Sequence, residues 1–266
     1  YNNRDHRKIL VIDGQIGYTG GANLADEYIN QRERFGHWKD SAVRLDGRAV
    51  KALTRLFLMN WYINQGEIED FDKYHMENQA VDGEGFYIPF GSGPKPIYKS
   101  QVGKAVYQNI INQATDYVYI TTPYLIIDYD LTEDIRNAAL RGVDVRIVTP
   151  SIPDKKLIQI VTRGAYPDLM EAGVKIYEYT PGFIHSKQVL ADDEVAVVGT
   201  INFDYRSLVH HYENAVWMYR SPELTKIRTD FEEIFSVSQQ IKLDTFRITW
   251  YQYLIKEIMQ LFAPML

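Results

Sequence analysis

The sequence predicts an α/β protein made of two related halves, each with a mixed, mostly parallel central sheet between layers of helices. Two observations lead to this prediction. A polar motif occurs twice at a constant spacing, and apolar strand-like runs alternate with helical segments after a turn-rich stretch. Alternation of this kind is typical of α/β folds, and self-similarity indicates a repeated architectural unit.

The repeated motif places a histidine, a lysine, an aspartate and an asparagine at fixed intervals. The first copy is His6, Lys8, Asp13 and Asn23, and the second is His185, Lys187, Asp192 and Asn202. Every member of the second copy lies 179 positions after its counterpart, as 185 − 6 and 202 − 23 show. A single copy arises easily by chance, but two copies in register do not, so we interpret them as two copies of one half-site.

The first copy begins almost at the start of the chain, in a half that we assign to residues 1–80. Its strands are expected near 8–12, 16–18 and 42–45, and its helix near 49–65. The second copy, in contrast, lies about 88 residues (185 − 97) into its own half. We therefore expect the first half to be truncated at its amino terminus, with further strands and helices in an upstream segment.

Residues 81–96 are rich in glycine and proline and are predicted to link the halves. The second half is assigned to residues 97–240. Its expected elements alternate along the chain, with helices near 101–114 and 132–141 and strands near 117–121, 143–148 and 174–179.

Residues 241–266 are predicted to form an amphipathic carboxy-terminal segment. Helical spacing places its apolar side chains on one face, namely Trp250, Leu254, Ile255, Ile258, Leu261 and Phe262. This face is expected either to pack on the protein's own core or to lie in a membrane interface, and the sequence leaves both alternatives open.

Composition narrows the possible functions. The formal net charge is −6, whereas a protein that binds a nucleic-acid backbone usually has a strongly basic face, so no nucleic-acid partner is expected. The chain has no cysteine, which excludes disulfides, thiolate metal sites and cysteine nucleophiles. No uncharged apolar run approaches the length of about 18 residues that a membrane-spanning helix needs.

The motif residues suit the chemistry of a phosphodiester. Residues two apart in a strand point to the same side, so His6 lies with Lys8, and His185 with Lys187. A neutral imidazole can attack phosphorus and form a phosphohistidine, while a second, protonated imidazole donates a proton to the leaving alkoxide. Because the lysines can stabilise the charge on the phosphoryl oxygens, we predict no metal and no other cofactor.

Four further residues are predicted to support this site. Asn23 and Asn202 offer uncharged amide donors for phosphate oxygens. Glu213, eleven residues after Asn202, and Asp40 are candidates to orient a catalytic histidine. An ordinary ion pair would explain either carboxylate equally well, so that alternative stays open.

The remaining candidates are weaker. Asp13 and Asp192 end their strands and are included in the catalytic set, although a role as turn formers is equally open. No role is assigned to the other histidines, which are His37, His75, His210 and His211. His210, His211 and Glu213 come nearest to a metal-binding cluster, but adjacent residues in a strand face opposite ways.

The doubled pattern His-x-Lys-x4-Asp-x6-Gly-(Gly/Thr)-x-Asn resembles the phospholipase D superfamily. Longer stretches are similar to bacterial cardiolipin synthases, and the likeness extends over nearly the whole chain. These stretches are Asn3–Gly14, Gly20–Tyr28, Thr122–Tyr124, Gly199–Ser207 and the ending Leu261–Leu266.

The resemblance implies two pseudo-symmetric phospholipase D-type half-domains of α/β/α architecture. It implies a reaction in which one phosphatidylglycerol loses glycerol to form a phosphatidyl-histidine, which a second phosphatidylglycerol resolves to cardiolipin. The implied catalytic set is His6, Lys8, Asp13, His185, Lys187 and Asp192, with His6 more often the nucleophile. The implied location is the bacterial cell membrane, with anchoring helices upstream of this chain.

Two alternatives to a cardiolipin synthase remain. A phospholipase D-type hydrolase or nuclease would pass the covalent intermediate to water. A non-catalytic lipid-binding module would use the same fold without turnover, although intact motifs in both halves argue against it.

Overall fold

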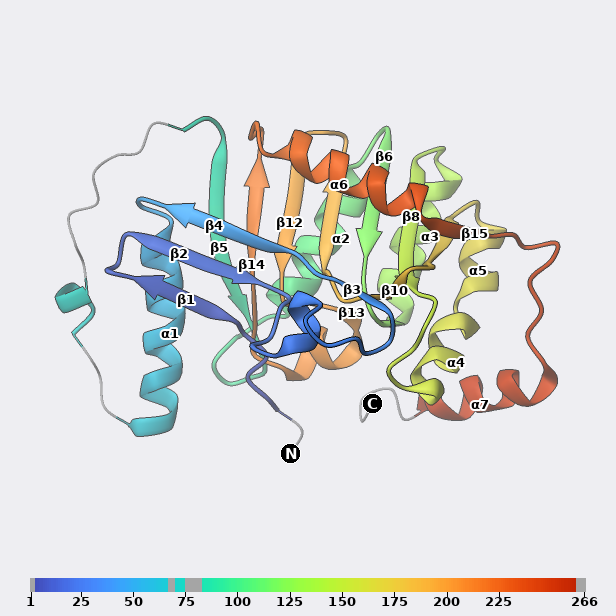
Figure 1. The fold of residues 1–266 in the computed structure, drawn as a ribbon, viewed down its shortest axis with the longest axis horizontal. Coiled ribbons are helices and arrows are strands. Elements are labelled where there is room, and N and C mark those ends of the chain that lie inside the picture. Colours follow the sequence, from blue (N-terminus) through green and yellow to red (C-terminus); the bar gives the residue numbers. More distant parts are fainter. Residues whose placement is uncertain (1–2, 67–69, 75–82, 262–266) are drawn as a thin grey trace.

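An eight-stranded mixed sheet forms the centre of the computed structural model, which describes residues 3–66, 70–74 and 83–261 (Figure 1). The strand order is β15-β9-β8-β6-β11-β12-β14-β5. In that order the bounds are Ser238–Ile241, Lys175–Tyr179, Asp144–Pro150, Tyr117–Thr121, Gln188–Ala191, Val195–Gly199, Glu213–Tyr219 and Phe86–Ser92. The predicted α/β class with a mixed sheet is confirmed.

The prediction that this sheet is mostly parallel is wrong. Within it, β8 pairs in parallel with β6 and β9, and the other pairings are antiparallel. The reason lies in the motif itself. Asp192 and Asp193 have positive φ angles of 53° and form a tight turn, so β11 and β12 enter the sheet as a hairpin.

Helices cover both faces of the large sheet. On one face α2 (Val102–Gln113), α3 (Tyr129–Leu140) and α5 (Tyr166–Glu171) bury their apolar side chains against the strands. On the other face lies α6 (Leu224–Ser236), whose Phe231 is fully buried. The layered arrangement predicted for the second half is therefore present.

The first half adds a small antiparallel sheet and one helix. In chain order these elements are β1 (Ile9–Ile12), β2 (Ile16–Gly20), β4 (Ala42–Asp46) and α1 (Val50–Gln65). They pack on the face that also carries α6, where Leu53 and Leu56 of α1 join a cluster with Leu190 and Val216 of the large sheet. The two halves thus share a hydrophobic core.

The repeat is visible in the strand register. Ile9 pairs with Thr19 between β1 and β2, and Gln188 pairs with Val198 between β11 and β12, again 179 positions later. On its other side β11 pairs with β6, whereas the described residues place no strand beside the corresponding edge of β1. The upstream segment expected from the sequence stays a prediction.

The stretch predicted as a linker, residues 81–96, is not a plain connection. Residues 86–92 of it form β5, which pairs with β14 at the edge of the large sheet, and residues 81–82 lie outside the described part of the chain. Pro89 lies within this strand, and proline is tolerated in a sheet at an edge strand, so this stretch belongs to the second half's sheet.

The carboxy-terminal helix α7 (Trp250–Leu261) packs on α4 (Lys156–Gly164) with its polar side inward. Lys256 is 8% exposed, whereas Trp250 is 78% and Leu254 is 50% exposed. Packing of the apolar face on the protein's own core is therefore contradicted for the described residues, and Phe262 lies outside them. Among the described helices, none is long and apolar enough to cross a membrane.

Candidate active site

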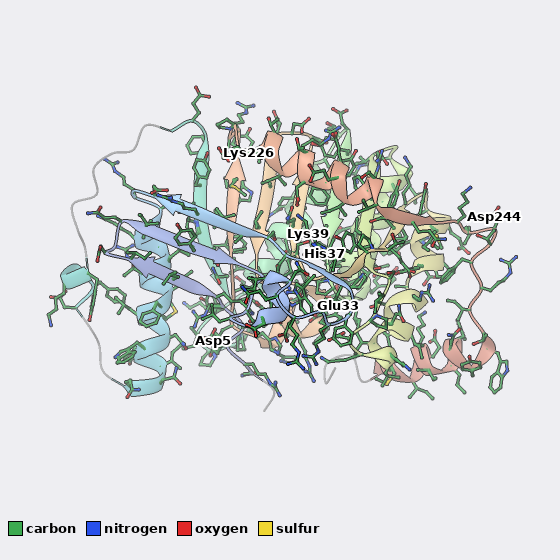
Figure 2. All side chains as sticks on the ribbon, viewed as in Figure 1. Asp5, Glu33, His37, Lys39, Lys226 and Asp244 are labelled. Atoms are coloured by element: carbon green, nitrogen blue, oxygen red, sulfur yellow. The ribbon has the colours of Figure 1, made fainter. Side chains whose placement is uncertain are left out.

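Two short parallel backbone pairings place each motif histidine beside a carboxylate residue. β10 (Gly182–Ile184) pairs with β3 (His37–Lys39), so that the next residues in register are His185 and Asp40. In the first half, Asp5 forms a parallel bridge with Tyr212, and the next residues are His6 and Glu213. Figure 2 labels Asp5 and His37 at the entrances to these two segments. The same local geometry thus occurs twice.

Each histidine contacts a carboxylate from the other half of the chain. His6 Nδ1 lies 2.9 Å from Glu213 Oε1 and 3.0 Å from Oε2, and His185 Nδ1 lies 2.8 Å from Asp40 Oδ2. An Nδ1–H donated to the carboxylate leaves the Nε2 lone pair available for chemistry. Both predicted orienting carboxylates therefore lie where that role requires, but their pairing is crosswise.

The motif lysines adopt matching positions beside the histidines. Lys8 Nζ donates to the carbonyl oxygen of His6 at 2.7 Å, and Lys187 Nζ donates to the carbonyl oxygen of His185. Lys187 is 1% exposed, and its Nζ also lies 2.9 Å from Nδ1 and 3.0 Å from Nε2 of His185. In the second copy the ammonium therefore lies beside the imidazole, as predicted, and in the first copy the lysine is bonded to the backbone of its histidine.

Burial governs the electrostatics of both lysines. It lowers the pKa of Lys187 to about 7, with the charge of Lys8 acting in the same direction and the Asp40 and Glu213 carboxylates opposing. Burial also lowers the pKa of Lys8, again against Glu213 and Asp40. Because each lysine interacts with the carboxylates of both pairs, the two constellations lie within electrostatic range of each other.

The pKa values of His185 and of its partner Asp40 are both lowered. Burial, followed by the Lys187 ammonium, lowers the pKa of His185 to about 3, although Asp40 opposes this. Burial would raise the pKa of Asp40, but the hydrogen bond from His185 and the charge of Lys187 outweigh it and lower the pKa. His185 is therefore neutral at neutral pH, and Asp40 is charged.

Glu213 is fully buried and still ionised. Burial disfavours its charge, but the nearby His6 and the hydrogen-bonding groups around it lower its pKa to about 2. The Thr200 hydroxyl donates to the same carboxylate. Thr200 occupies the variable Gly/Thr position of the motif, so that position helps to hold the carboxylate that serves His6.

The two predicted phosphate-binding asparagines are differently placed. Asn23 is exposed, and its Nδ2 donates to the Tyr28 hydroxyl at 2.6 Å. The Tyr28 ring packs edge-on against His185, with 5.3 Å between centroids. Asn202 is buried, and its Nδ2 donates to Asp204 at 2.8 Å, while its Oδ1 has no hydrogen-bond partner among the described residues.

Several residues at the site were not found from the sequence. The rings of Tyr28 and Trp38 pack against His185, with 5.4 Å between the Trp38 and His185 ring centroids. Buried Asp204 accepts a hydrogen bond from Asn202. Aromatic residues are common in cores, so nothing in their spacing distinguished them. The stretches around the motifs that resemble known sequences do include Tyr28 and Asp204, which was the one available signal.

The motif aspartates, Asp13 and Asp192, lie elsewhere than the predicted catalytic set requires. Asp13 and Asp192 lie in turns at the far ends of β1 and β11, so a strand of four residues separates each from its lysine, or roughly 15 Å along the chain. Asp192 accepts hydrogen bonds from the backbone of residues 115–117, which anchors the start of β6. The structure therefore does not bring the two aspartates together with the histidines.

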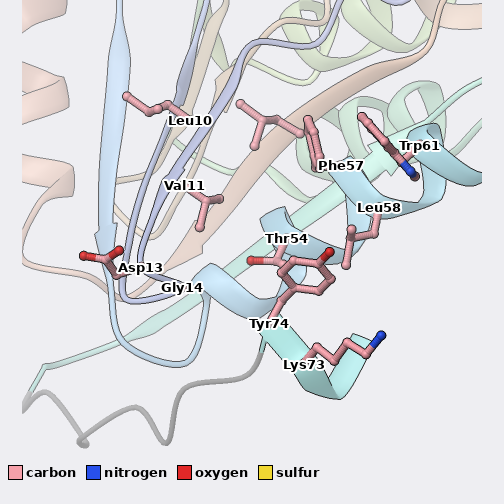
Figure 3. Close-up of a pocket in the computed structure, with 11 residues that line it drawn as sticks. Leu10, Val11, Asp13, Gly14, Thr54, Phe57, Leu58, Trp61, Lys73 and Tyr74 are labelled. Atoms are coloured by element: carbon pink, nitrogen blue, oxygen red, sulfur yellow. The ribbon is translucent and has the colours of Figure 1, made fainter. Parts of the chain in front are cut away.

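A cavity of about 700 Å³ lies away from these histidines, between β1, α1 and the short 3-10 helix Phe71–Tyr74 (Figure 3). Leu10, Val11 and Phe57 are among the mostly apolar residues that line it. In the second half the equivalent edge, that of β11, is covered by β6. The cavity thus marks the uncovered edge of β1, and no histidine or lysine of the motifs lines it.

Comparison with known proteins gives consistent similarities. The family described as "Cardiolipin synthase, PLD-like domain" matches residues 107–235. A cardiolipin synthase of Halalkalibacterium halodurans is 37% identical over 269 residues, covering 100% of this chain and 53% of the relative. An uncharacterized protein of Streptococcus mutans is 48% identical over 268 residues, covering 100% of this chain and 58% of the relative. The chain spans about half the length of these curated relatives.

A solved structure shows the same fold. The crystal structure of phosphatidylserine synthase from Haemophilus influenzae superimposes with a TM-score of 0.71, covering 98% of this chain and 69% of that chain. Sequence identity is 14%, so the likeness concerns the fold alone.

Proposed function

Because this chain is a cardiolipin synthase-like member of the phospholipase D superfamily, we propose that it carries the catalytic centre of a phosphatidyltransferase that makes cardiolipin. The substrate is phosphatidylglycerol, and the products are cardiolipin and glycerol. The observation that carries this proposal is the crosswise pairing of His6 with Glu213 and of His185 with Asp40, each with a motif lysine that donates to the histidine's carbonyl oxygen.

The first step forms the covalent intermediate. Nε2 of His6 attacks phosphorus, and the bond from phosphorus to the glycerol oxygen breaks. His185, protonated at that point, gives its proton to the departing glycerol oxygen. Lys8 and Lys187 neutralise the phosphoryl oxygens, and Asn23 and Asn202 add hydrogen bonds after leaving their present partners.

The second step regenerates the enzyme. Neutral His185 removes the proton from a hydroxyl of a second phosphatidylglycerol, whose oxygen attacks phosphorus and displaces His6. Since the low pKa of His185 keeps it neutral, it has to take up a proton when the anionic phosphodiester binds. Exchange of the two histidine roles is the alternative, because a neutral His185 could itself attack.

The test is to supply the full protein with vesicles of phosphatidylglycerol alone. Formation of cardiolipin and glycerol in equal amounts supports the proposal. Formation of phosphatidic acid would indicate a hydrolase, and the absence of any turnover would favour a non-catalytic lipid-binding module. His6→Ala and His185→Ala should each remove turnover. Quenched enzyme digested to peptides should carry the phosphatidyl group on His6, and its presence on His185 would reverse the assigned roles.

We further propose that α7 holds the chain on the surface of the bacterial membrane that contains this substrate. Its outward side chains are aromatic or aliphatic, with Trp250 78%, Tyr253 57% and Leu254 50% exposed. Tryptophan and tyrosine favour the interface between lipid and water. In Figure 1, α7 lies along the lower side of the molecule, where the amino-terminal end that leads into His6 also lies.

Vesicle co-sedimentation tests this attachment. Trp250→Ala combined with Tyr253→Ala should weaken binding to phosphatidylglycerol vesicles at least tenfold. Leu140→Ala is the matched control, because Leu140 is 65% exposed on α3 and should not change binding. Equal binding by all variants would remove α7 from the proposal.

A further inference from the structure

A second imidazole lies beside the catalytic histidine of the first motif. The His211 ring centroid is 5.8 Å from that of His6, and His211 Nδ1 is 3.7 Å from Glu213 Oε1, too far for a hydrogen bond. The His211 side chain is 12% exposed, and within the described ranges neither ring nitrogen has a hydrogen-bond partner. A largely buried imidazole whose ring nitrogens have no hydrogen-bond partner is costly, so both nitrogens are available to a ligand.

The three side chains form a compact donor set. One ring nitrogen from each of His6 and His211 and one oxygen of Glu213 all lie within 4.8 Å of one another. Two imidazoles and a carboxylate are typical ligands of zinc and of similar divalent transition metals. Adjacent His210 points elsewhere, with its ring 5.6 Å from that of Tyr205. The third ligand, His6, comes from the other end of the chain, which sequence spacing did not reveal.

We propose that His6, His211 and Glu213 bind a divalent transition-metal ion such as Zn²⁺ and that the bound ion switches the active site off. Tetrahedral bonds of about 2.0–2.1 Å place ligand atoms about 3.3 Å apart. The contacts to Glu213 Oε1 are 2.9 Å from His6 and 3.7 Å from His211, each within about 0.4 Å of that separation, and all three ligand atoms already lie within 4.8 Å of one another.

Inhibition follows from the electron pairs of His6. At present Nδ1 faces Glu213, and Nε2 is the free nitrogen. When the metal takes the Nδ1 lone pair, the ring's proton moves to Nε2, and when the metal binds Nε2 it takes that lone pair directly. Either way His6 keeps no lone pair for phosphorus. This consequence rests on the proposed function, whereas metal binding itself does not.

Binding is tested with the metal alone, by calorimetric titration of the full protein with Zn²⁺ and by the visible absorption of Co²⁺. We expect one ion per chain with a tetrahedral Co²⁺ spectrum. His211→Asn should weaken affinity at least about tenfold, and His210→Asn, the adjacent control, should leave it unchanged. His211→Gln serves as a second variant should His211→Asn unfold.

Turnover is measured separately in the same variants. Zn²⁺ should suppress cardiolipin formation by the wild type and by His210→Asn, reversibly with chelator, while His211→Asn stays active at the same Zn²⁺ concentration. Wild-type affinity in the folded His211 variants, or no ion bound by the wild type, would overturn the proposal. Metal binding without any phosphatidyl transfer would leave the site intact and refute only the proposed function.

Discussion

Replacing Asp192 by alanine should destabilise the protein and leave its chemistry intact. The Asp192 carboxylate accepts four hydrogen bonds, from the Thr115 amide at 2.7 Å and hydroxyl at 3.1 Å, the Asp116 amide at 3.0 Å and the Tyr117 amide at 2.8 Å. These bonds hold the first residue of β6, which pairs with β11 beside the second motif.

The magnitude follows from the number and exposure of these bonds. Hydrogen bonds to a charged group contribute about 1.5–3 kcal/mol each when buried, but Asp192 is partly exposed and water can replace it for some donors. We therefore expect the loss of the four hydrogen bonds alone to cost about 2–3 kcal/mol. For a chain of this size, that loss lowers Tm by roughly 4–12 °C.

Asp13→Ala is the matched control, because Asp13 is the counterpart of Asp192 in the repeat. Both residues have a positive φ, 51° for Asp13 and 53° for Asp192. Alanine adopts this left-handed conformation less readily than aspartate, so both substitutions cost about 1 kcal/mol of stability for the backbone alone. Asp13 is exposed and has no hydrogen-bond partner for its carboxylate within the described ranges. The difference between the two variants thus isolates the four hydrogen bonds.

The assay combines calorimetric unfolding with the rate of cardiolipin formation per folded molecule. Both variants should keep kcat within a few-fold of the wild type. A hundredfold loss of kcat in Asp192→Ala at unchanged Tm would refute this reasoning and return the aspartate to the catalytic set.

Three further predictions concern the site itself. Glu213→Gln and Asp40→Asn should each lower kcat by about 10²–10⁴-fold, since each histidine loses the anion that fixes its tautomer, and turnover at the wild-type rate would contradict the crosswise pairing. The second prediction concerns pH, because the pKa of His185 is about 3 in the folded protein and 6.5 in the unfolded chain. The unfolded chain therefore takes up a proton that the folded protein does not, and the protein loses stability as the pH falls from about 6.5 toward 3. His185→Asn should make Tm fall less steeply with decreasing pH in this range. Gly21→Ala should reduce kcat with little loss of fold, because an added Cβ would lie 2.1 Å from Asp40 Oδ1 and push that carboxylate from His185, and an unchanged rate would show that Asp40 can move freely.

Much of the fold could be predicted because the relevant signals are local. The helix expected near 49–65 is α1, and the strands expected near 117–121 and 174–179 are β6 and β9. Whether neighbouring strands are parallel or antiparallel was harder to predict from the sequence. β6 is parallel to β8 but antiparallel to β11, and this depends on how tight turns and helical crossovers connect the strands, which apolar runs do not encode.

The site could be predicted where residues close in sequence were sufficient and not where a contact crosses the chain. The proximity of His185 and Lys187 was predicted from the period of a strand, although the structure places both in the connection between β10 and β11. Assigning each carboxylate to its histidine needed the pairing of β3 with β10 and of Asp5 with Tyr212, contacts between segments 145 and 207 positions apart. His211 was set aside because adjacent residues in a strand face opposite ways, but His211 precedes β14, and its neighbour His6 is supplied by the fold.

The crosswise pairing makes each copy of the motif depend on the other half of the chain. A carboxylate from the same half would complete each half-site independently, and either half could then work alone. Here Glu213 lies beside the second motif but orients His6, and Asp40 follows the first motif but orients His185. Each half supplies one lysine whose pKa responds to the other lysine or to the other half's carboxylate. The orientation of each histidine therefore depends on docking of both halves, which is the condition that the proposed mechanism requires.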